Sequence, residues 1–480
     1  MTKNERNPLK NVALHNLGCK VNSYEIEVMQ QKLSEKGYSI VSFAPGADIY
    51  IINTCTVTNI ADRKSRQMLH KAKKMNPDAI VVAVGCYVQT GKDKIVPDDC
   101  IDLAIGNNRK KDVVEILEAY IAEKESDMSG RDKTLQDKTL QDTTIPDINH
   151  VDDYEEMQLY KTAEHTRAYI KIQDGCNQFC SYCIIPYARG RVRSRRKEDV
   201  LNEIRGLVEN GYKEVVVTGI HLSSYGLDFL KKETGDYLGG TNDIREAVYK
   251  QEFLLKLLEE MQDIDGLERI RLGSLEPRII TERFAKCLNG MNKICPHFHL
   301  SLQSGSDSVL QRMNRHYTTD EYFEKVQILR RYFEHPAITT DIITGFPQES
   351  EEEFEQTVDF VNKVCFYETH IFRYSKRHGT VAAKMDGQLT DAVKARRSEV
   401  LLKINKKNAK EFREYYIGAH VEVLLEEKKV INGRSYMIGY TKEYVQAAVE
   451  TDKNLTNYVV SGEISAFLTD DILLLNFSDK

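Results

Sequence analysis

The stretch GCNQFCSYCIIPYARG, residues 175–190, is the most informative part of this 480-residue chain. Its cysteines, Cys176, Cys180 and Cys183, have the spacing C-x3-C-x2-C and directly follow an apolar run that predicts a strand. Three thiolates on one short loop can bind three irons of a [4Fe–4S] cluster and leave the fourth iron open. A structural zinc site needs four ligands, and this loop has no fourth cysteine or histidine. The loop therefore predicts an iron–sulfur site, with zinc or three unrelated buried cysteines as the alternatives.

Around this cysteine loop, strand-like runs alternate with helical stretches over residues 167–374. The six predicted strands are RAYIKIQ (167–173), EVVVTGIHL (214–222), RIRLGS (269–274), HFHLSLQ (297–303), AITTDIITGF (337–346) and ETHIFRY (368–374). This alternation predicts a full or partial parallel β/α barrel. Residues 228–250 are expected to form an excursion on one loop. Residues 391–414 predict a long polar helix, whose eight basic and four acidic side chains give it a net charge of +4.

The N-terminal region carries three more cysteines, each close to the end of a predicted strand. VALHNLG (12–18), ADIYIINTC (47–55) and AIVVAVGC (79–86) predict buried strands of a parallel sheet, with helical segments between them. The carboxyl ends of such strands meet at one sheet edge, where ligands bind in open parallel sheets. We therefore expect Cys19, Cys55 and Cys86 to converge there, with buried free cysteines as the alternative.

Two further segments differ from this α/β pattern. RDKTLQDKTLQDTT (131–144) repeats DKTLQ and has no apolar period, which is typical of a flexible charged linker. From residue 415 the hydrophobic period becomes two, and five short predicted strands indicate a small barrel of the oligonucleotide-binding type. The chain is thus predicted to be an α/β protein with domains at 10–122, 161–412 and 415–480, joined by a linker over 123–160.

Composition limits the function classes. The 67 Lys and Arg against 73 Asp and Glu give a net charge of −6, which argues against a protein held on nucleic acid by bulk charge. No run approaches 18 apolar residues and the start lacks a secretory pattern, so we expect a cytoplasmic protein without a membrane span. In that reducing compartment, ten cysteines indicate metal or cluster binding in preference to disulfides.

The cysteine loop resembles that of the radical S-adenosylmethionine (SAM) enzymes. Together with five other motifs it is similar to the methylthiotransferase family over nearly the whole chain; these motifs are LGCKVNSYE (17–25), NTCTVT (53–58), VGCYVQ (84–89), SLQSGSDSVLQRMNRHY (301–317) and TTDIITGFPQES (339–350). The resemblance implies two [4Fe–4S] clusters. One, on the catalytic Cys176, Cys180 and Cys183, cleaves SAM, and the other, on Cys19, Cys55 and Cys86, carries sulfur. It also implies a tRNA anticodon loop as substrate, an electron donor such as flavodoxin or ferredoxin, and a sulfur donor.

The family has three substrate branches. The Lys-Val pair after Cys19, TGIHLSSYG (218–226) and GSLEP (273–277) resemble the branch that adds a methylthio group to carbon 2 of N6-threonylcarbamoyladenosine at position 37 of tRNA. The alternatives are isopentenyl-adenosine 37 and an aspartate of a ribosomal protein. A rival of another class is a non-catalytic iron–sulfur protein that binds RNA.

Further site residues follow from position. Tyr182 lies between two loop cysteines and is expected near the adenine of SAM. Polar residues at barrel strand ends are typical of active sites, and they predict SAM contacts by Thr218, Gly219, Ser274, Glu276, Gln303 and Asp341. The basic run Arg189, Arg191, Arg193, Arg195, Arg196 and Lys197 predicts phosphate contacts with RNA. The C-terminal module resembles the family's RNA-binding TRAM domain, with Tyr440 or Tyr444 expected to stack on bases.

Overall fold

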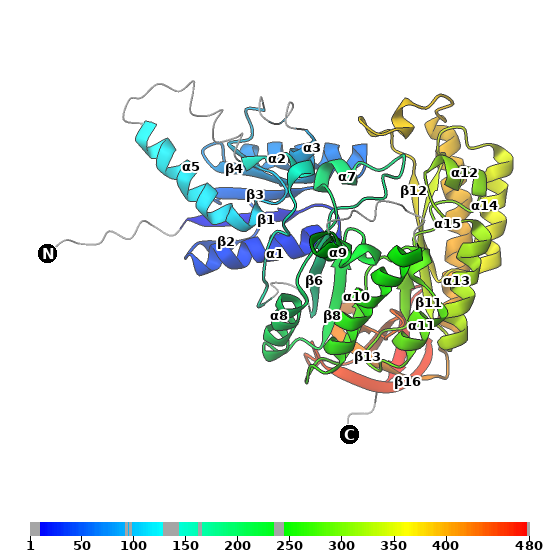
Figure 1. Cartoon of the computed structure of the whole chain (residues 1–480). Helices are drawn as coiled ribbons and strands as arrows, with labels where there is room; N and C mark the ends of the chain where they lie inside the picture. The colour runs from blue at the N-terminus through cyan, green and yellow to red at the C-terminus, as the bar shows by residue number, and fades with distance from the viewer. Residues whose placement is uncertain are drawn as a thin grey trace. The chain divides into compact units, whose positions relative to one another are not determined.

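The computed structural model describes residues 10–91, 95, 98–127, 144–161, 166–234 and 244–477. They form two compact units, of which Figure 1 shows the elements. The N-terminal unit comprises residues 1–163, 173–195 and 375–380, and the C-terminal unit comprises 164–172, 196–374 and 381–480. The DKTLQ repeat and part of the 228–250 excursion lie outside the described residues. Within the described part of the chain, every helix is too short or too polar to cross a membrane.

The N-terminal unit is built on a parallel sheet with the order β2-β1-β3-β4-β5. The strands are β1 (Asn11–Asn16), β2 (Ser39–Val41), β3 (Ile49–Thr54), β4 (Ile80–Gly85) and β5 (Leu103–Ile105). Its helices include α1 (Lys20–Glu35), α2 (Asn59–Met75), α3 (Cys86–Thr90) and α5 (Val113–Asp127). The three predicted strands are confirmed, because β3 and β4 are buried throughout and so appear as continuous apolar runs. The order places a topological switch between β1 and β3, where ligands bind in such sheets.

The predicted linker is shorter than expected at both ends. Helix α5 extends to Asp127, and residues 144–160 pack on the N-terminal unit through the buried side chains Ile145, Ile148, Met157 and Leu159. The Tyr24 hydroxyl of α1 donates a hydrogen bond of 2.6 Å to the Met157 carbonyl. The cysteine loop, residues 173–195, also belongs to this unit, whereas the sequence placed it in the barrel domain.

The C-terminal unit contains a partial barrel of the six predicted strands. Strands β8 (Glu214–Gly219) and β9 (Arg269–Leu272) follow β6 (Arg167–Asp174) in one sheet, and β10 (His297–His299), β11 (Ala337–Thr344) and β12 (Glu368–Arg373) form the next. Parallel bridges from Ile270 to Ile294 and from Leu275 to Leu300 join the two sheets. The connecting helices are α8 (Lys197–Glu209), α9 (Leu227–Thr234), α10 (Ile244–Gln262), α11 (Glu282–Asn289), α12 (Asp307–Arg312), α13 (Thr319–Tyr332) and α14 (Glu351–Val364) (Figure 1).

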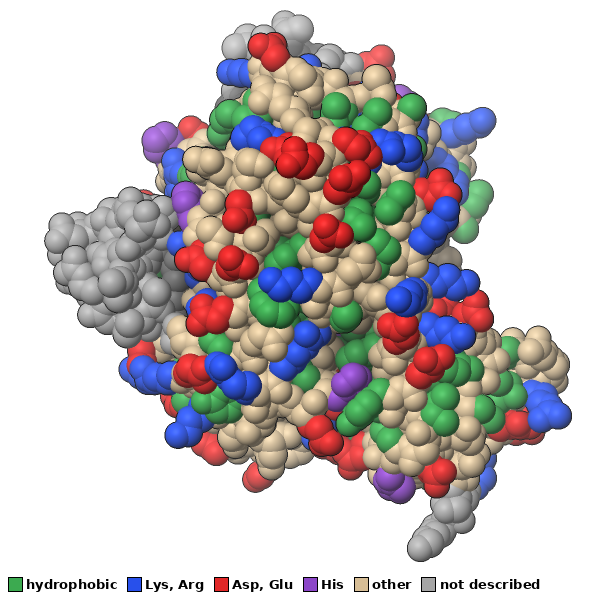
Figure 2. All heavy atoms as spheres, turned by 90° about the vertical axis from the view of Figure 1, so that its right-hand side faces the viewer, with side chains coloured by type: hydrophobic (Ala, Val, Ile, Leu, Met, Phe, Trp, Pro, Cys, Tyr) green, Lys and Arg blue, Asp and Glu red, His purple; other side chains and the backbone are tan. Residues whose placement is uncertain are grey.

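Helix α15 (Asp391–Glu414) has the bounds predicted from the sequence. Its exposed lysines form i,i+4 pairs with acidic side chains: Lys403 with Glu399, Lys407 with Glu411 and Lys410 with Glu414. Figure 2 likewise shows basic and acidic side chains interspersed on the face turned to the viewer. These three pairs are already counted in the net charge of +4. That charge is offset by acidic side chains of other segments, which pair with the remaining basic residues: Arg396 with Glu351, Arg397 with Glu349, Lys406 with Asp470 and Arg413 with Glu368.

The five predicted C-terminal strands close into a small barrel in the order β13-β14-β15-β17-β16. They are β13 (His420–Ile431), β14 (Arg434–Tyr440), β15 (Gln446–Glu450), β16 (Val459–Phe467) and β17 (Leu473–Asn476). The loop after β14 packs on the partial barrel. The Tyr440 and Tyr444 rings stack at 4.5 Å, with Arg167 over both rings and Arg271 over Tyr444. These two half-buried tyrosines therefore take part in packing within the C-terminal unit, and their stacking on RNA bases stays a prediction.

Candidate active site

The three N-terminal cysteines come together at the carboxyl edge of the parallel sheet. Cys19 is the N-cap of α1 after β1, Cys55 follows β3, and Cys86 begins α3 after β4. Gly18 has φ +113°, and a Cβ there would lie 3.1 Å from the Cys55 sulfur, so the Cys19 loop touches Cys55. Burial raises the pKa of Cys55 to about 12, and the neighbouring Cys86 and Cys19 thiols raise it as well. The three cysteines thus follow neighbouring strands at the same edge of the sheet, and their binding of a cluster stays a prediction.

Asn22 holds the Cys19 loop in place. Its Nδ2 donates to the carbonyls of Leu17, at 2.7 Å, and of Thr54, at 3.1 Å. These carbonyls lie beside Cys19 and Cys55 in the chain, so one buried amide links the ends of β1 and β3. The Ser65 hydroxyl adds a second restraint on Cys55, because it bonds to both the backbone N–H and the carbonyl of that residue.

The C-x3-C-x2-C motif forms a tight turn within the N-terminal unit. The Cys176 backbone N–H donates to the Gly190 carbonyl at 3.0 Å, and the Cys183 N–H to the Cys180 carbonyl at 2.9 Å. The Gln178 N–H lies 3.5 Å from the Cys176 sulfur. Phe179 adopts the left-handed conformation at φ 47°, under the guanidinium of Arg191 at 4.5 Å. Cys180 is buried and the other two cysteines are half-buried, so three thiols occupy one partly open loop.

Arg189 connects this loop to the helix that follows Cys19. It is fully buried at the end of α7 (Ile185–Arg189), and its guanidinium donates to Glu25 at 2.8 Å and Asp174 at 3.1 Å. It also donates to Asn22 Oδ1 at 2.6 Å, and buried Lys110 pairs with Glu25. Two cations thus balance two carboxylates, which is the condition for burying such charges.

A second link reaches Cys86 directly. The Asn107 amide nitrogen lies 3.5 Å from the Cys86 sulfur and 2.7 Å from the Ala188 carbonyl, next to Arg189. Hydrogen bonds to the ligand sulfurs are among the interactions that set the reduction potential of a cluster. The polar network therefore contacts Cys86 directly and reaches the segment that ends at Gly190, whose carbonyl accepts a hydrogen bond from the Cys176 N–H.

Three arginines of the basic run around the end of the cysteine loop are buried, whereas the sequence predicted that the whole run contacts RNA phosphates. Arg189, Arg193 and Arg195 are at most 2% exposed, so they offer no surface to an RNA phosphate. Arg193 donates to the Arg189 carbonyl at 2.9 Å, and Arg195 to the Tyr24 hydroxyl at 3.5 Å. The predicted RNA contact is thereby narrowed to the three remaining residues, which are exposed or half-buried: Arg191, Arg196 and Lys197.

The residues predicted to bind SAM occupy the expected strand ends. In the C-terminal unit, Thr218 and Gly219 end β8, Ser274 and Glu276 follow β9, Gln303 follows β10, and Asp341 lies within β11. Gln303, at φ 74°, donates its N–H to the Asp341 carbonyl at 2.8 Å. Glu276 accepts a hydrogen bond from Arg278 at 2.6 Å, whereas Ser274 is exposed. Tyr182 is half-buried on the cysteine loop of the N-terminal unit. Their contacts with SAM stay a prediction.

Sequence analysis missed the polar groups that support the cysteines. Asn22 and Glu25 could have been identified from LGCKVNSYE, because they follow Cys19 at positions three residues apart and so share one helix face. Asn107 and Lys110 carry no comparable signal, since their role depends on packing against segments far away in sequence.

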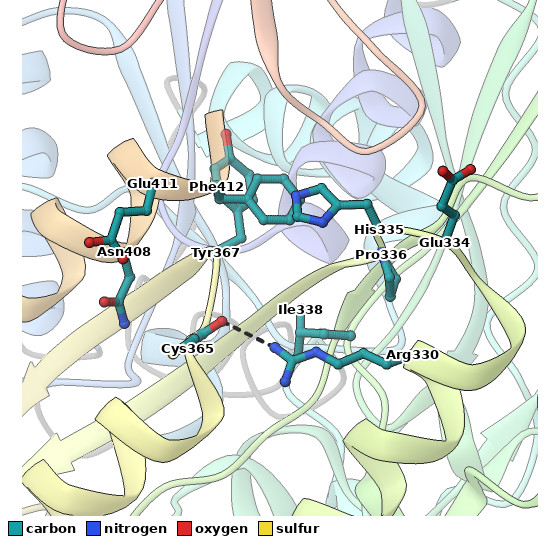
Figure 3. Close-up of a pocket in the computed structure, with 10 residues that line it drawn as sticks. All are labelled: Arg330, Glu334, His335, Pro336, Ile338, Cys365, Tyr367, Asn408, Glu411 and Phe412. Carbon is teal, nitrogen blue, oxygen red and sulfur yellow. Dashed lines mark hydrogen bonds between the residues drawn. The ribbon is translucent and has the colours of Figure 1, made fainter. Parts of the chain in front are cut away.

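The C-terminal unit also has a cavity of about 370 Å³ near the amino ends of β11 and β12 (Figure 3). Its wall includes His335, whose ring stacks on Phe412 at 4.2 Å and on Tyr415 at 3.8 Å, and Arg330, which donates to the Cys365 carbonyl. None of the predicted cofactor residues lines this cavity, because they lie towards the opposite ends of the strands.

Comparison with known proteins identifies the family. Residues 170–361 match the radical SAM superfamily, and residues 11–106 match the uncharacterized protein family UPF0004. The threonylcarbamoyladenosine tRNA methylthiotransferase MtaB of Bacillus subtilis is 36% identical over 94% of this chain and 93% of its own length. The chain belongs to the methylthiotransferase family of radical SAM enzymes.

Other relatives agree with this assignment, and a solved structure shares the fold. The MtaB of Aquifex aeolicus is 37% identical over 89% of this methylthiotransferase and 95% of its own length. A tRNA-2-methylthio-N(6)-dimethylallyladenosine synthase of Finegoldia magna is 31% identical over 97% and 94%. The radical SAM methyltransferase TsrM from Kitasatospora setae shares the fold, with a TM-score of 0.52 and 16% identity over 76% of this chain and 75% of that one.

The two sets of cysteines fit the cofactors of such enzymes. Each set offers three thiols, from neighbouring strands in one set and from one loop in the other. A [4Fe–4S] cluster bound by three thiols would keep one iron without a protein ligand. Burial raises the pKa of Cys55 and so disfavours its thiolate form in the cluster-free protein.

Proposed function

We propose that this methylthiotransferase adds a methylthio group to carbon 2 of N6-threonylcarbamoyladenosine at position 37 of tRNA. The observation that carries the proposal is the presence of two separate sets of three free cysteines, one at the edge of the parallel sheet and one on the loop that ends at Arg189, because the reaction needs one site for SAM cleavage and one for sulfur. The relatives at 36% and 37% identity, which bear this activity in their names, favour the threonylcarbamoyl substrate over the dimethylallyl substrate of the relative at 31%.

Each group of residues has a distinct task in this proposal. A [4Fe–4S] cluster on Cys176, Cys180 and Cys183 would supply the electron that cleaves SAM, and one on Cys19, Cys55 and Cys86 would carry the transferred sulfur. Asn22, Arg189 and Asn107 position these cysteines. Glu276 and Gln303, at strand ends of the partial barrel, are the residues that we expect to orient SAM.

The proposal also defines the partners. The target adenine must leave the stacked anticodon loop before its carbon 2 can react. We assign the phosphate contacts to Arg191, Arg196 and Lys197, the surface members of the basic run. A low-potential electron donor such as flavodoxin or ferredoxin and a sulfur donor complete the reaction, and the cytoplasm supplies tRNA and both donors.

The test is an assay of the reconstituted enzyme with SAM, a reductant and a sulfur source. Its substrates are tRNA with threonylcarbamoyl-adenosine 37, tRNA with isopentenyl-adenosine 37, and ribosomal protein. Mass spectrometry should detect the methylthio product on the first substrate alone, and Cys176→Ala should abolish it. Product on either of the other substrates alone would contradict the proposal, and an absence of SAM cleavage would favour a non-catalytic RNA-binding protein.

A further inference from the structure

Three polar side chains lie together on the inner face of the partial barrel. His299 ends β10, Asp341 lies in β11, and His370 lies in β12. Asp341 is in register with His370, and Thr339, two residues earlier on the same face, is in register with His299. The adjacent Thr340 points the other way, because its hydroxyl meets Tyr322 of the outer helix α13 at 3.4 Å. Alternation along the strand therefore turns Asp341 and its two neighbours inward.

The geometry of the three side chains is compact. The His299 Nε2 lies 3.3 Å from Asp341 Oδ2, while its Nδ1 is engaged by the Thr339 hydroxyl at 3.0 Å. The His299 and His370 rings stack at 5.7 Å, and one polar atom from each of the three residues lies within 4.8 Å of the others. Exposure rises from 12% for the His299 side chain to 30% for Asp341, and His370 is exposed. The group is thus partly open to a ligand.

The packing around the three side chains indicates that a ligand reaches them from the carboxyl ends of the barrel strands. Towards the amino ends of the strands, His297 lies against Tyr444, with their ring centroids 5.0 Å apart. Arg271 pairs with Glu214 at 2.8 Å, next to the loop after β14. This packing fills the amino end of the partial barrel. Towards the carboxyl ends of the strands, the Gln303 backbone N–H donates to the Asp341 carbonyl. The three side chains are therefore next to a residue that we expect to orient SAM.

We propose that His299, Asp341 and His370 bind the polar arm of the modified adenine and so select the threonylcarbamoyl substrate, which assigns Asp341 to the arm in place of the SAM contact expected from its strand position. This inference rests on the proposed function. The arm carries a carboxylate, a hydroxyl and amide N–H groups. Imidazole N–H groups donate to a carboxylate, and an aspartate accepts from a hydroxyl or an N–H, so the two sets are complementary. An apolar isopentenyl arm would cover these polar side chains without forming hydrogen bonds to them, and sites of this kind reject analogues that lack the bonded group.

The experiment measures affinity, which is independent of turnover. Anticodon stem–loop RNAs with threonylcarbamoyl-adenosine or isopentenyl-adenosine at position 37 are titrated by fluorescence anisotropy into the reconstituted enzyme. His370→Phe and Asp341→Asn are compared with His420→Phe, which alters an exposed histidine elsewhere in the same unit. We expect the wild type and His420→Phe to prefer the threonylcarbamoyl RNA by about tenfold or more, and the two site variants to lose most of that preference.

The outcomes separate this inference from the proposed function. A wild type without preference for the threonylcarbamoyl RNA would contradict the proposed function itself. A wild-type preference that survives in both site variants, or an equal loss of affinity for both RNAs, would overturn the inference and leave the function standing. A preference that vanishes without divalent cations and returns with Mn²⁺ or Zn²⁺ would also overturn it, because the side chains would then be metal ligands and would not contact the arm directly.

Discussion

Arg189 is a full positive charge that no solvent reaches, and it is held by two carboxylates and one amide from different segments. Arg189→Met should lower the free energy of unfolding of the N-terminal unit by about 3–5 kcal/mol, because Asp174 would lose its ion pair with Arg189 and Glu25 would keep Lys110 but lose Arg189. Thermal unfolding followed by circular dichroism measures the loss. Arg191→Met is the matched control: this exposed arginine lies over Phe179 and should cost about 0.5–1 kcal/mol. Equal losses in both variants would contradict the role of Arg189.

Asn107 is the side chain that donates to the Cys86 sulfur. Asn107→Leu should lower the reduction potential of a cluster on Cys19, Cys55 and Cys86, because hydrogen bonds to sulfur stabilise the reduced, more negative state. A redox titration followed by electron paramagnetic resonance, in protein that also carries Cys176→Ala, Cys180→Ala and Cys183→Ala, isolates this cluster. An unchanged or raised potential would show that the Asn107 contact does not act on the cluster.

At this scale the sequence indicated where the cysteines lie better than which side chains support them. Position at predicted strand ends placed Cys19, Cys55 and Cys86 at one sheet edge, and the family resemblance made them cluster ligands, which stays a prediction. The arginines of the basic run were misjudged, since an arginine-rich segment normally faces solvent. Burial of Arg189 depends on Glu25, which is 164 residues away in the chain, and no local pattern reports that contact.

The conformation of the cysteine loop depends on the turn at Gly175. This residue has φ +71°, and a Cβ there would lie 1.8 Å from the Arg191 carbonyl oxygen. Gly175→Ala should therefore displace the loop and reduce the iron bound by Cys176, Cys180 and Cys183 after reconstitution. Gly46→Ala tests the backbone strain alone, about 1–2 kcal/mol, because Gly46 has φ +107° and nothing within 4 Å. Comparable iron loss in both variants would show that strain and not the clash is responsible.

Helix α14 begins with a carboxylate that ties it to α12. Glu353 completes the capping box with Ser350, and its side chain accepts hydrogen bonds from Arg312 and Ser308. Hydrogen bonding to Arg312, with Ser308 and the Ser350 backbone, lowers the pKa of Glu353 to about 2. A depressed pKa stabilises the folded state above the unfolded value of about 4.3, and this stabilisation is lost as the pH falls through about 2.

Glu353→Gln should therefore cost about 1–2 kcal/mol at pH 7 and progressively less below pH 4. Melting temperatures at pH 7 and pH 3 measure the difference from wild type. The control is Glu355→Gln, an exposed position on the same helix. A gap between Glu353→Gln and wild type that stays constant with pH would contradict this role.

Periodic elements were predictable and short ones were not. The bounds of α15 were found from its polar pattern, and β3 and β4 from their apolar runs. Strands β2 and β5 have three residues each, too few for a periodic signal. The packing of residues 144–160 was missed because five apolar anchors, Ile145, Ile148, Tyr154, Met157 and Leu159, are spread without helix or strand spacing.

For the whole molecule, contacts and not chain order define the units. The six cysteines assigned to clusters all belong to the N-terminal unit, although 90 residues separate Cys86 from Cys176. The sequence divided these cysteines between two domains, because alternating strands and helices resume only after the linker. The partial barrel and the C-terminal barrel were both recognised as folds, since each is built from strands of regular spacing.

We expect one chain to carry two independent three-cysteine cluster sites. Iron and acid-labile sulfide per chain, measured after anaerobic reconstitution, would show how many of these sites bind a cluster. Wild type should bind about eight irons, and the triple alanine variants of Cys19, Cys55 and Cys86 or of Cys176, Cys180 and Cys183 should each retain about four. A wild type with about four irons that falls to none in the second variant would contradict the account, because the N-terminal cysteines would then hold no cluster.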